Sequence, residues 1–111
     1  MAAKRKRLTA AEHVRKIALA LPEVTEGSSY GTPGFYRKKK LFARLHQDGA
    51  SLVLRIGFDA RDALLDGDPD VFFVTPHYDG YPIVLLRMAK AKPTVLKRAL
   101  ADAWAFAVSR K

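Results

Sequence analysis

The sequence predicts a two-layer α+β protein in which an N-terminal and a C-terminal helix cover one face of a five-stranded antiparallel sheet. Apolar residues recur at helical spacing near both ends of the chain, alternating apolar residues fill the middle, and the links between the alternating segments are short enough for hairpins. The expected order is helix, three strands, short helix, two strands, helix. Because the two terminal helices supply one apolar layer, the other sheet face should be open to solvent.

Composition limits the kind of protein this can be. The 111 residues fit one domain, which we place at residues 9–111 behind a disordered basic arm at residues 1–8. Cysteine is absent, which excludes disulfides and thiolate metal sites. No apolar run has the length of a membrane span, so we expect a soluble, cytoplasmic protein. The net charge of +9 favours polyanionic partners such as nucleic acid, although solubility and a basic tail would also explain it.

The first helix has clear start and stop signals. Thr9 and Glu12 form a capping box, in which each side chain accepts a hydrogen bond from a backbone amide of the other residue. Pro22 ends the helix, because the residue before a proline avoids helical geometry. The helix should therefore span about residues 9–21, and the turn-rich segment 22–34 should be a loop.

The most readable hairpin surrounds Asp48-Gly49, a strong turn signal. Counting outward from this turn pairs Leu45 with Leu52, Ala43 with Leu54, and Leu41 with Ile56. These six side chains should face the core. The opposite, open face should carry Phe42, Arg44, His46, Ser51, Val53 and Arg55.

The second half of the chain contains a short helix with Asp59 as its N-cap, then strands near residues 71–75 and 81–88. The "PHYDG" turn joins these two strands. Pro93 begins the last helix, where the missing amide of proline costs nothing. Its buried stripe should be Leu96, Leu100, Ala103, Trp104, Ala107 and Val108. Most of the main aromatic residues should lie in the core or at its edge, a set made up of Tyr30, Phe35, Tyr36, Phe72, Phe73, Tyr78, Tyr81 and Trp104.

A basic cluster on the open face is the strongest functional candidate. If Lys38-Lys39 forms a hairpin tip, Arg37 pairs with Lys40 and Phe35 with Phe42. Guanidinium and ammonium groups among aromatic rings suit phosphate contact combined with base stacking. The candidate phosphate contacts are Arg37, Lys38, Lys39, Lys40, Arg44 and Arg55, with Phe35 and Phe42 as stacking residues. The three lysines could equally form a soluble turn, or protect a sheet edge from intermolecular pairing.

Catalytic and metal-binding patterns are weak. The sequence contains no Walker motif, dinucleotide fingerprint or nucleophile elbow, so we expect neither an enzyme nor a cofactor. His46 with Asp48 and His77 with Asp79 could each combine an imidazole with a carboxylate, but both pairs lie beside turns where Asp has a backbone role. We therefore predict no catalytic residues and no metal ligands. The acidic patch from Asp59 to Asp70 is also better explained by capping and turns.

Several blocks of the sequence, in order, resemble the MmcQ/YjbR family: "LPEVTEG", "GTPGF", "KLFARL", "FFVTPHY", "YPIVLLRM" and the late Trp104. The resemblance implies a CyaY-like fold and a double-wing DNA-binding role, with Lys38–Lys40 in one wing and the 76–82 turn in the other. It supplies no catalytic residues. We therefore expect the protein to bind DNA with little sequence specificity. We also expect it to be a monomer and not to associate with a membrane. The alternative is a frataxin-like protein-interaction or metal-handling module that uses the Asp59–Asp70 patch.

Overall fold

The computed structural model describes residues 9–109, and the predicted basic arm at residues 1–8 lies outside them. The elements in chain order are α1 (Ala10–Ala20), β1 (Val24–Ser29), β2 (Thr32–Arg37), β3 (Lys40–Leu45), β4 (Ser51–Arg55), α2 (Phe58–Gly67), β5 (Phe72–Phe73), the 3-10 turn η1 (Pro76–Tyr78), β6 (Ile83–Arg87), the 3-10 turn η2 (Met88–Lys90) and α3 (Pro93–Ser109).

The strands form one antiparallel sheet in the order β1-β2-β3-β4-β6-β5. The predicted α+β class with an antiparallel sheet is confirmed, but the sheet has six strands among the described residues rather than five. The additional strand is β1, which lies in the segment 22–34 that the sequence predicts as a loop. The sequence does not predict this strand, because it contains glycine and serines and has no alternating apolar pattern. It is an exposed edge strand that is stabilised by backbone pairing with β2.

Two helix starts test the capping predictions. Both hydrogen bonds of the predicted capping box are present at α1, with Glu12 N donating to Thr9 Oγ1 at 3.1 Å and Thr9 N to Glu12 Oε1 at 2.8 Å. The predicted cap at Asp59 is wrong, because Gly57 is the N-cap of α2 and no side chain caps it. Asp59 lies instead in the first turn, where a negative charge is favourable beside the helix dipole.

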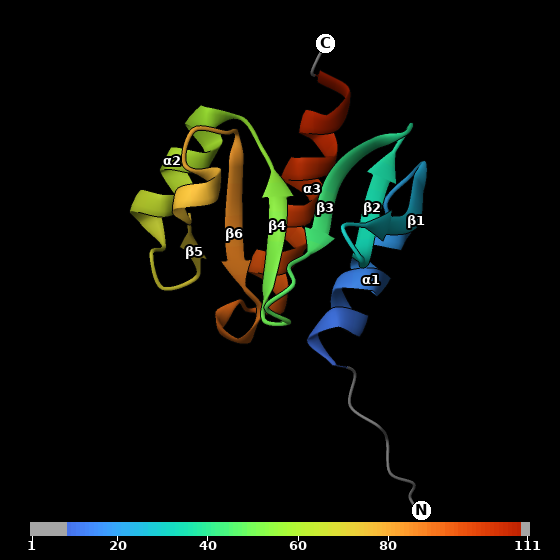
Figure 1. The fold of residues 1–111 in the computed structure, drawn as a ribbon, viewed down its shortest axis with the longest axis horizontal. Helices are drawn as coiled ribbons and strands as arrows, with labels where there is room; N and C mark the ends of the chain where they lie inside the picture. Colours follow the sequence, from blue (N-terminus) through green and yellow to red (C-terminus); the bar gives the residue numbers. More distant parts are fainter. Residues whose placement is uncertain (1–8, 110–111) are drawn as a thin grey trace, which may run out of the picture.

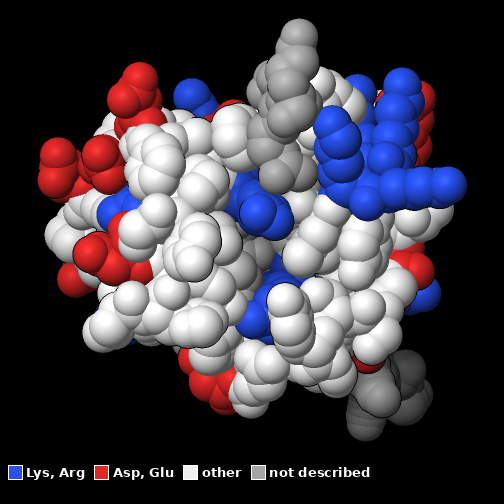
Figure 2. Space-filling view, turned by 45° about the horizontal axis from the view of Figure 1, so that its top comes forward, with Lys and Arg blue, Asp and Glu red and all other residues white. Residues whose placement is uncertain are grey.

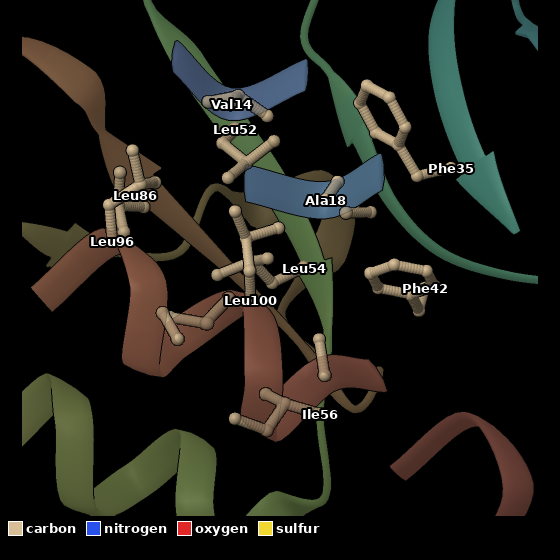
Figure 3. Packing of buried hydrophobic residues seen from close by; sticks show 14 of the residues in the cluster. Val14, Ala18, Phe35, Phe42, Leu52, Leu54, Ile56, Leu86, Leu96 and Leu100 are labelled. Atoms are coloured by element: carbon tan, nitrogen blue, oxygen red, sulfur yellow. The ribbon is translucent and has the colours of Figure 1, made fainter. Parts of the chain in front are cut away.

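The main core lies between the sheet and the two terminal helices (Figures 1 and 3). Its helical part matches the predicted stripe, except that Val108 is 43% exposed and Trp104 is only partly buried. The buried members are Val14, Ala18, Phe35, Phe42, Ala43, Leu52, Leu54, Ile56, Val71, Phe72, Val84, Leu86, Leu96, Ala99, Leu100, Ala103 and Ala107. None of the described helices is long and apolar enough to cross a membrane.

The β3–β4 register is as predicted, with Leu45 opposite Leu52 and Ala43 opposite Leu54. Between β2 and β3 the register shifts, so that Phe35 pairs with Ala43 and Phe42 is an extra residue. Such a bulge lets two neighbouring side chains point to the same side of a sheet. Phe35 and Phe42 are both fully buried in the core, so their predicted place on the open face is wrong.

The same bulge reverses the alternation in the first part of β3. Tyr36 pairs with Leu41, and Leu41 lines a hollow on the open face instead of facing the core with Ile56 as predicted. A smaller apolar cluster lies on this open face, where Val53, Ile83 and Leu85 are buried beside Phe73 and Tyr78. The open face is thus partly apolar.

Candidate nucleic-acid interface

Lys38 and Lys39 form the tip of the β2–β3 hairpin, between Arg37 and its predicted partner Lys40. Both lysines have positive φ angles, of 49° and 71°. This backbone fits a tight primed turn, for which Asn and Gly are the favoured residues. Two exposed lysines in left-handed geometry are unfavourable for the backbone, because each brings its Cβ close to a carbonyl oxygen.

The position of this turn within the sheet bears on the predicted roles of the lysines. β2 and β3 are interior strands, and the edges of the described sheet are β1 and β5. The lysines themselves lie in the turn between these two interior strands, although the edge strand β1 begins beside them, with Val24 paired to Arg37. Figure 2 shows Lys and Arg side chains gathered at the upper right, where Figure 1 places this hairpin tip, and acidic side chains gathered on the side of α2.

Arg37 faces the helical layer, so its predicted place on the open face is wrong. Its guanidinium carbon lies 3.5 Å from the centre of the Trp104 ring, and Nη1 donates to Trp104 O at 3.1 Å. Trp104 in turn donates from Nε1 to Pro22 O at 2.8 Å. These contacts connect β2 to α3 and to the end of α1. Arg37 is therefore committed to structure.

Glu23 provides the negative charge next to the hairpin tip. Its Oε1 lies 3.4 Å from Nε of Arg37, and its Oε2 lies 3.6 Å from Nζ of Lys38. The Lys38 side chain is 62% exposed, so this ion pair is worth little. Most of the charge of the two tip lysines thus remains available to an anionic partner.

A hollow of about 650 Å³ opens on the sheet face away from the terminal helices. We call it the open-face hollow. Arg44 and Arg55, both predicted to lie on this face, line it together with His46 and His77. Among residues 9–109, no aspartate or glutamate lines the hollow. In Figure 2, basic side chains show among uncharged ones near the middle of the molecule.

Arg44 is 5% exposed, and neutral groups surround its guanidinium. Nη2 donates to the Tyr78 hydroxyl at 2.5 Å, and Nη1 lies 3.3–3.4 Å from the oxygens of Thr32, Leu45 and Gln47. Among the described residues no carboxylate lies within ion-pairing distance of Arg44. Its positive charge is therefore buried without a counter-charge from the part of the chain that the structure describes.

Arg55 is half-buried at the end of β4, opposite Ile83. Its Nε is buried and has no hydrogen-bond partner within the part of the chain that the structure describes. No carboxylate of residues 9–109 forms an ion pair with it either. A buried donor without a partner is costly, so Arg55 has the features of a group that binds something from outside the chain.

Tyrosine rings form the rim of the open-face hollow, and the sequence does not predict this. Tyr30 is 79% exposed and Tyr81 is 57% exposed, and both belong to the set of aromatic residues of which most were expected in or beside the core. Tyr30 lies in the β1–β2 turn with a positive φ of 53°, and the Arg44 guanidinium lies 5.1 Å from its ring centre. Its position beside the turn glycine Gly31 was the one available sign that Tyr30 lies outside the core.

The predicted second wing at residues 76–82 packs against α2 and the open face. Arg61 holds it, because Nη1 donates to Asp79 O at 2.9 Å and to Tyr81 O at 2.8 Å. His77 is exposed and its ring meets that of Tyr78 edge to face, with centres 4.8 Å apart. This segment therefore contributes tyrosines to the hollow, and no lysine or arginine.

The His46 and Asp48 pair stabilises the β3–β4 turn. Asp48 accepts hydrogen bonds from Ala50 N, Ser51 N and Ser51 Oγ, and Asp48 N donates to His46 Nδ1 at 3.1 Å. Burial acts to raise the pKa of Asp48, but these hydrogen bonds and the nearby His46 outweigh it and hold the pKa below its ordinary value. The predicted turn role for Asp48 explains this geometry.

The acidic patch gives no sign of a metal site. Of its five aspartates, Asp62 lies 3.4 Å from Nε of Arg61, and four are exposed. No group of three or more His, Asp or Glu side chains among residues 9–109 is arranged to hold a metal ion. The metal-handling alternative thus has no support from the described residues.

Comparison with known proteins places the chain in a family. A family model described as YjbR matches residues 19–106. Uncharacterised proteins of Mycobacterium bovis and Mycobacterium tuberculosis are 45% identical over 42 residues, which is 38% of this chain and 33% of theirs. The match thus spans a third of the length of these relatives. No solved structure matches the chain. Because the family model covers most of the sequence, and the MmcQ/YjbR-like blocks lie within that range, the chain belongs to the YjbR family.

Proposed function

We propose that this protein binds DNA through phosphate contacts, with little dependence on base sequence, and that it acts as a binding protein rather than an enzyme. The observation that carries the proposal is the hairpin tip, where Lys38 and Lys39 are exposed in left-handed backbone geometry. Lysines at these two positions make the folded protein less stable than Asn-Gly would. Retained strain of this kind is a sign of function.

Lysine at the tip suits phosphate recognition better than base recognition. Its ammonium is a flexible point charge, whereas base edges are read by groups of fixed, two-pronged geometry such as arginine or asparagine. The net charge of +9 adds a general attraction to the phosphate backbone. Contacts to phosphate alone fix position without reading sequence. The proposed binding is therefore salt-dependent and nearly indifferent to sequence.

The test is duplex binding by fluorescence anisotropy over a salt series, comparing wild type with a Lys38→Gln, Lys39→Gln double variant. The slope of log K against log salt is about −0.9 per neutralised phosphate. The variant should weaken binding to unrelated duplexes alike and make the slope shallower by about two units.

A matched control removes the same charge from the helical layer. Lys16→Gln with Lys97→Gln takes two exposed lysines from α1 and α3, on the other side of the sheet. If the two double variants lose affinity equally, the tip contributes only to the general electrostatic attraction between protein and DNA, and the proposal fails. It also fails if the tip variant binds like wild type at every salt concentration.

A further inference from the structure

We propose that the open-face hollow binds a nucleoside monophosphate, with Arg44 and Arg55 holding the phosphate and the tyrosine rings of the rim contacting the base. The nucleotide could be free in solution or the unpaired, phosphorylated end of a single strand, since both present the same chemistry. This site is separate from the hairpin tip and stands whether or not the tip binds duplex DNA.

The positive charge of the hollow favours binding of an anion. Two arginines line it, no acidic side chain does, and neither arginine has a carboxylate partner in residues 9–109. Arg44 is 5% exposed, and burying a charge without a counter-charge is unfavourable. A bound anion would supply that counter-charge and give Arg55 Nε a hydrogen-bond acceptor.

A phosphate monoester matches the available donors. It carries about −1.5 to −2 charges near neutral pH, which two guanidinium groups balance. Arginine presents its N–H groups in a planar fork that fits phosphate oxygens. The Tyr78 hydroxyl accepts a hydrogen bond from Arg44 Nη2, so its own proton can be donated to a ligand oxygen.

The rim and the floor of the hollow favour a planar ring on the same ligand. Tyr30 and Tyr81 expose large aromatic surfaces at the rim, while Val53 and Ile83 provide an apolar floor. Stacking of a base on an aromatic side chain is favourable and tolerates any base. The volume of about 650 Å³ lies within the range of small-ligand sites.

The first experiment is calorimetric titration of the full chain with adenosine 5′-monophosphate, adenosine and inorganic phosphate. The nucleotide should bind at least about ten-fold more tightly than either part alone, because the proposed contacts to base and phosphate combine in one ligand. Backbone amide NMR should show the largest shifts at residues 44, 55 and 78–81. No binding of the nucleotide, equal binding of phosphate alone, or shifts confined to the helical face would overturn the proposal.

Variants separate a shaped site from general attraction. Arg55→Gln should weaken nucleotide binding at least about ten-fold, since it removes one of the two phosphate-binding guanidinium groups. Arg98→Gln removes the same charge from an exposed position on α3 and should leave the affinity unchanged. Tyr81→Ala should weaken binding and Tyr81→Phe should restore it, because the ring is the proposed contact. Equal losses for Arg55→Gln and Arg98→Gln would refute the site.

A competition arm identifies the source of the nucleotide. A 5′-phosphorylated thymidine oligonucleotide that displaces the bound nucleotide, and loses affinity with Arg55→Gln, would identify strand ends as ligands. Failure of the oligonucleotide to compete, together with binding of the mononucleotide, would identify free nucleotide. Both results support the hollow as a site for this chemistry. Loss of duplex binding in the hairpin-tip variant with intact nucleotide binding would show that the two surfaces act independently.

Discussion

The central guanidinium carbon of Arg37 lies 3.5 Å from the centre of the Trp104 ring, and Nη1 of Arg37 donates to the backbone oxygen of the same tryptophan. Glu23 also contacts this guanidinium, with its Oε1 3.4 Å from Arg37 Nε. One side chain of β2 is thus bound to α3 and to the segment that follows α1. The contact fixes how the helical layer sits on this end of the sheet.

Replacing Arg37 with lysine should therefore destabilise the protein without removing charge. Lysine cannot stack on the ring and donate to Trp104 O at once, so the free energy of unfolding should fall by about 1–2 kcal/mol. Trp104 is the sole tryptophan of the chain, and its fluorescence would report unfolding in guanidinium chloride. Arg98→Lys, at an exposed position of α3, is the control and should change stability by less than about 0.5 kcal/mol. An unchanged midpoint for Arg37→Lys would mean that the stack contributes nothing.

The position of Arg37 in the helical layer, and not on the open face, illustrates which structural features the sequence predicts and which it does not. The capping box of α1 and the β3–β4 register follow from local rules of capping and turn geometry, and the structure confirms them. The Lys38-Lys39 tip is also where the sequence predicts it, although turn rules disfavour lysine there. The bulge at Phe42 does not follow from these rules. It arises because the core takes up both Phe35 and Phe42, which a regular alternation would place on the open face.

The candidate site was predicted in part for the same reason. Arg44 and Arg55 lie on the part of the sheet beyond the bulge, so alternation placed them correctly on the open face. Their lack of acidic partners is a property of how distant segments meet, and no local pattern encodes it. The tyrosine rim likewise depends on the β1–β2 turn and on the 78–81 segment, which Arg61 positions from α2.

Substitutions at two neighbouring residues of β4 should change stability to very different extents. Leu54 is fully buried between the sheet and the helices, so Leu54→Ala should lower the free energy of unfolding by about 2–5 kcal/mol. Arg55→Gln removes a buried donor that has no partner among residues 9–109, so it should not lower the free energy of unfolding by more than about 0.5 kcal/mol. Chemical denaturation of both variants tests this. A large loss at Arg55 with a small one at Leu54 would mean that the register is shifted by one residue.

The β3–β4 turn should make stability depend on pH through Asp48. Burial alone would raise its pKa, but hydrogen bonds from Ala50 and Ser51 and the nearby His46 outweigh burial and lower the pKa in the folded protein. A carboxylate with a lowered folded-state pKa contributes stability above its unfolded-state value, and that contribution is lost as pH falls through the folded-state value. Asp48→Asn should thus be less stable than wild type near neutral pH and close to it in acid.

Urea denaturation of wild type and Asp48→Asn at neutral pH and at about pH 3 measures this difference, because the ordinary aspartate pKa lies between these two conditions. Ser51→Ala removes one of the donors to Asp48, so it should reduce the pH dependence without abolishing it. A stability gap between wild type and Asp48→Asn that stays constant, or widens, as the pH falls would contradict the assignment.

The hairpin tip allows backbone cost and charge to be separated in one pair of variants. Lys38→Asn with Lys39→Gly installs the residues that a primed turn favours, and should raise the free energy of unfolding by about 1–2 kcal/mol, since a left-handed non-glycine residue costs about this much. Lys38→Gln with Lys39→Gln removes the same two charges but keeps the strained geometry, so its stability should stay near wild type. The lost ion pair with Glu23 is too exposed to matter.

Both variants should bind duplex DNA more weakly than wild type and with a similar, shallower salt slope. The reason is that both lack the two positive charges proposed to contact phosphates. The Asn-Gly variant would then be more stable than wild type but would bind DNA more weakly. This combination is expected where backbone strain serves function. Without a gain in stability for Asn-Gly, the turn is not left-handed in solution. If Asn-Gly gains stability while both variants keep full affinity at every salt concentration, the lysines are a solvated turn and the strain at the tip serves something other than nucleic acid.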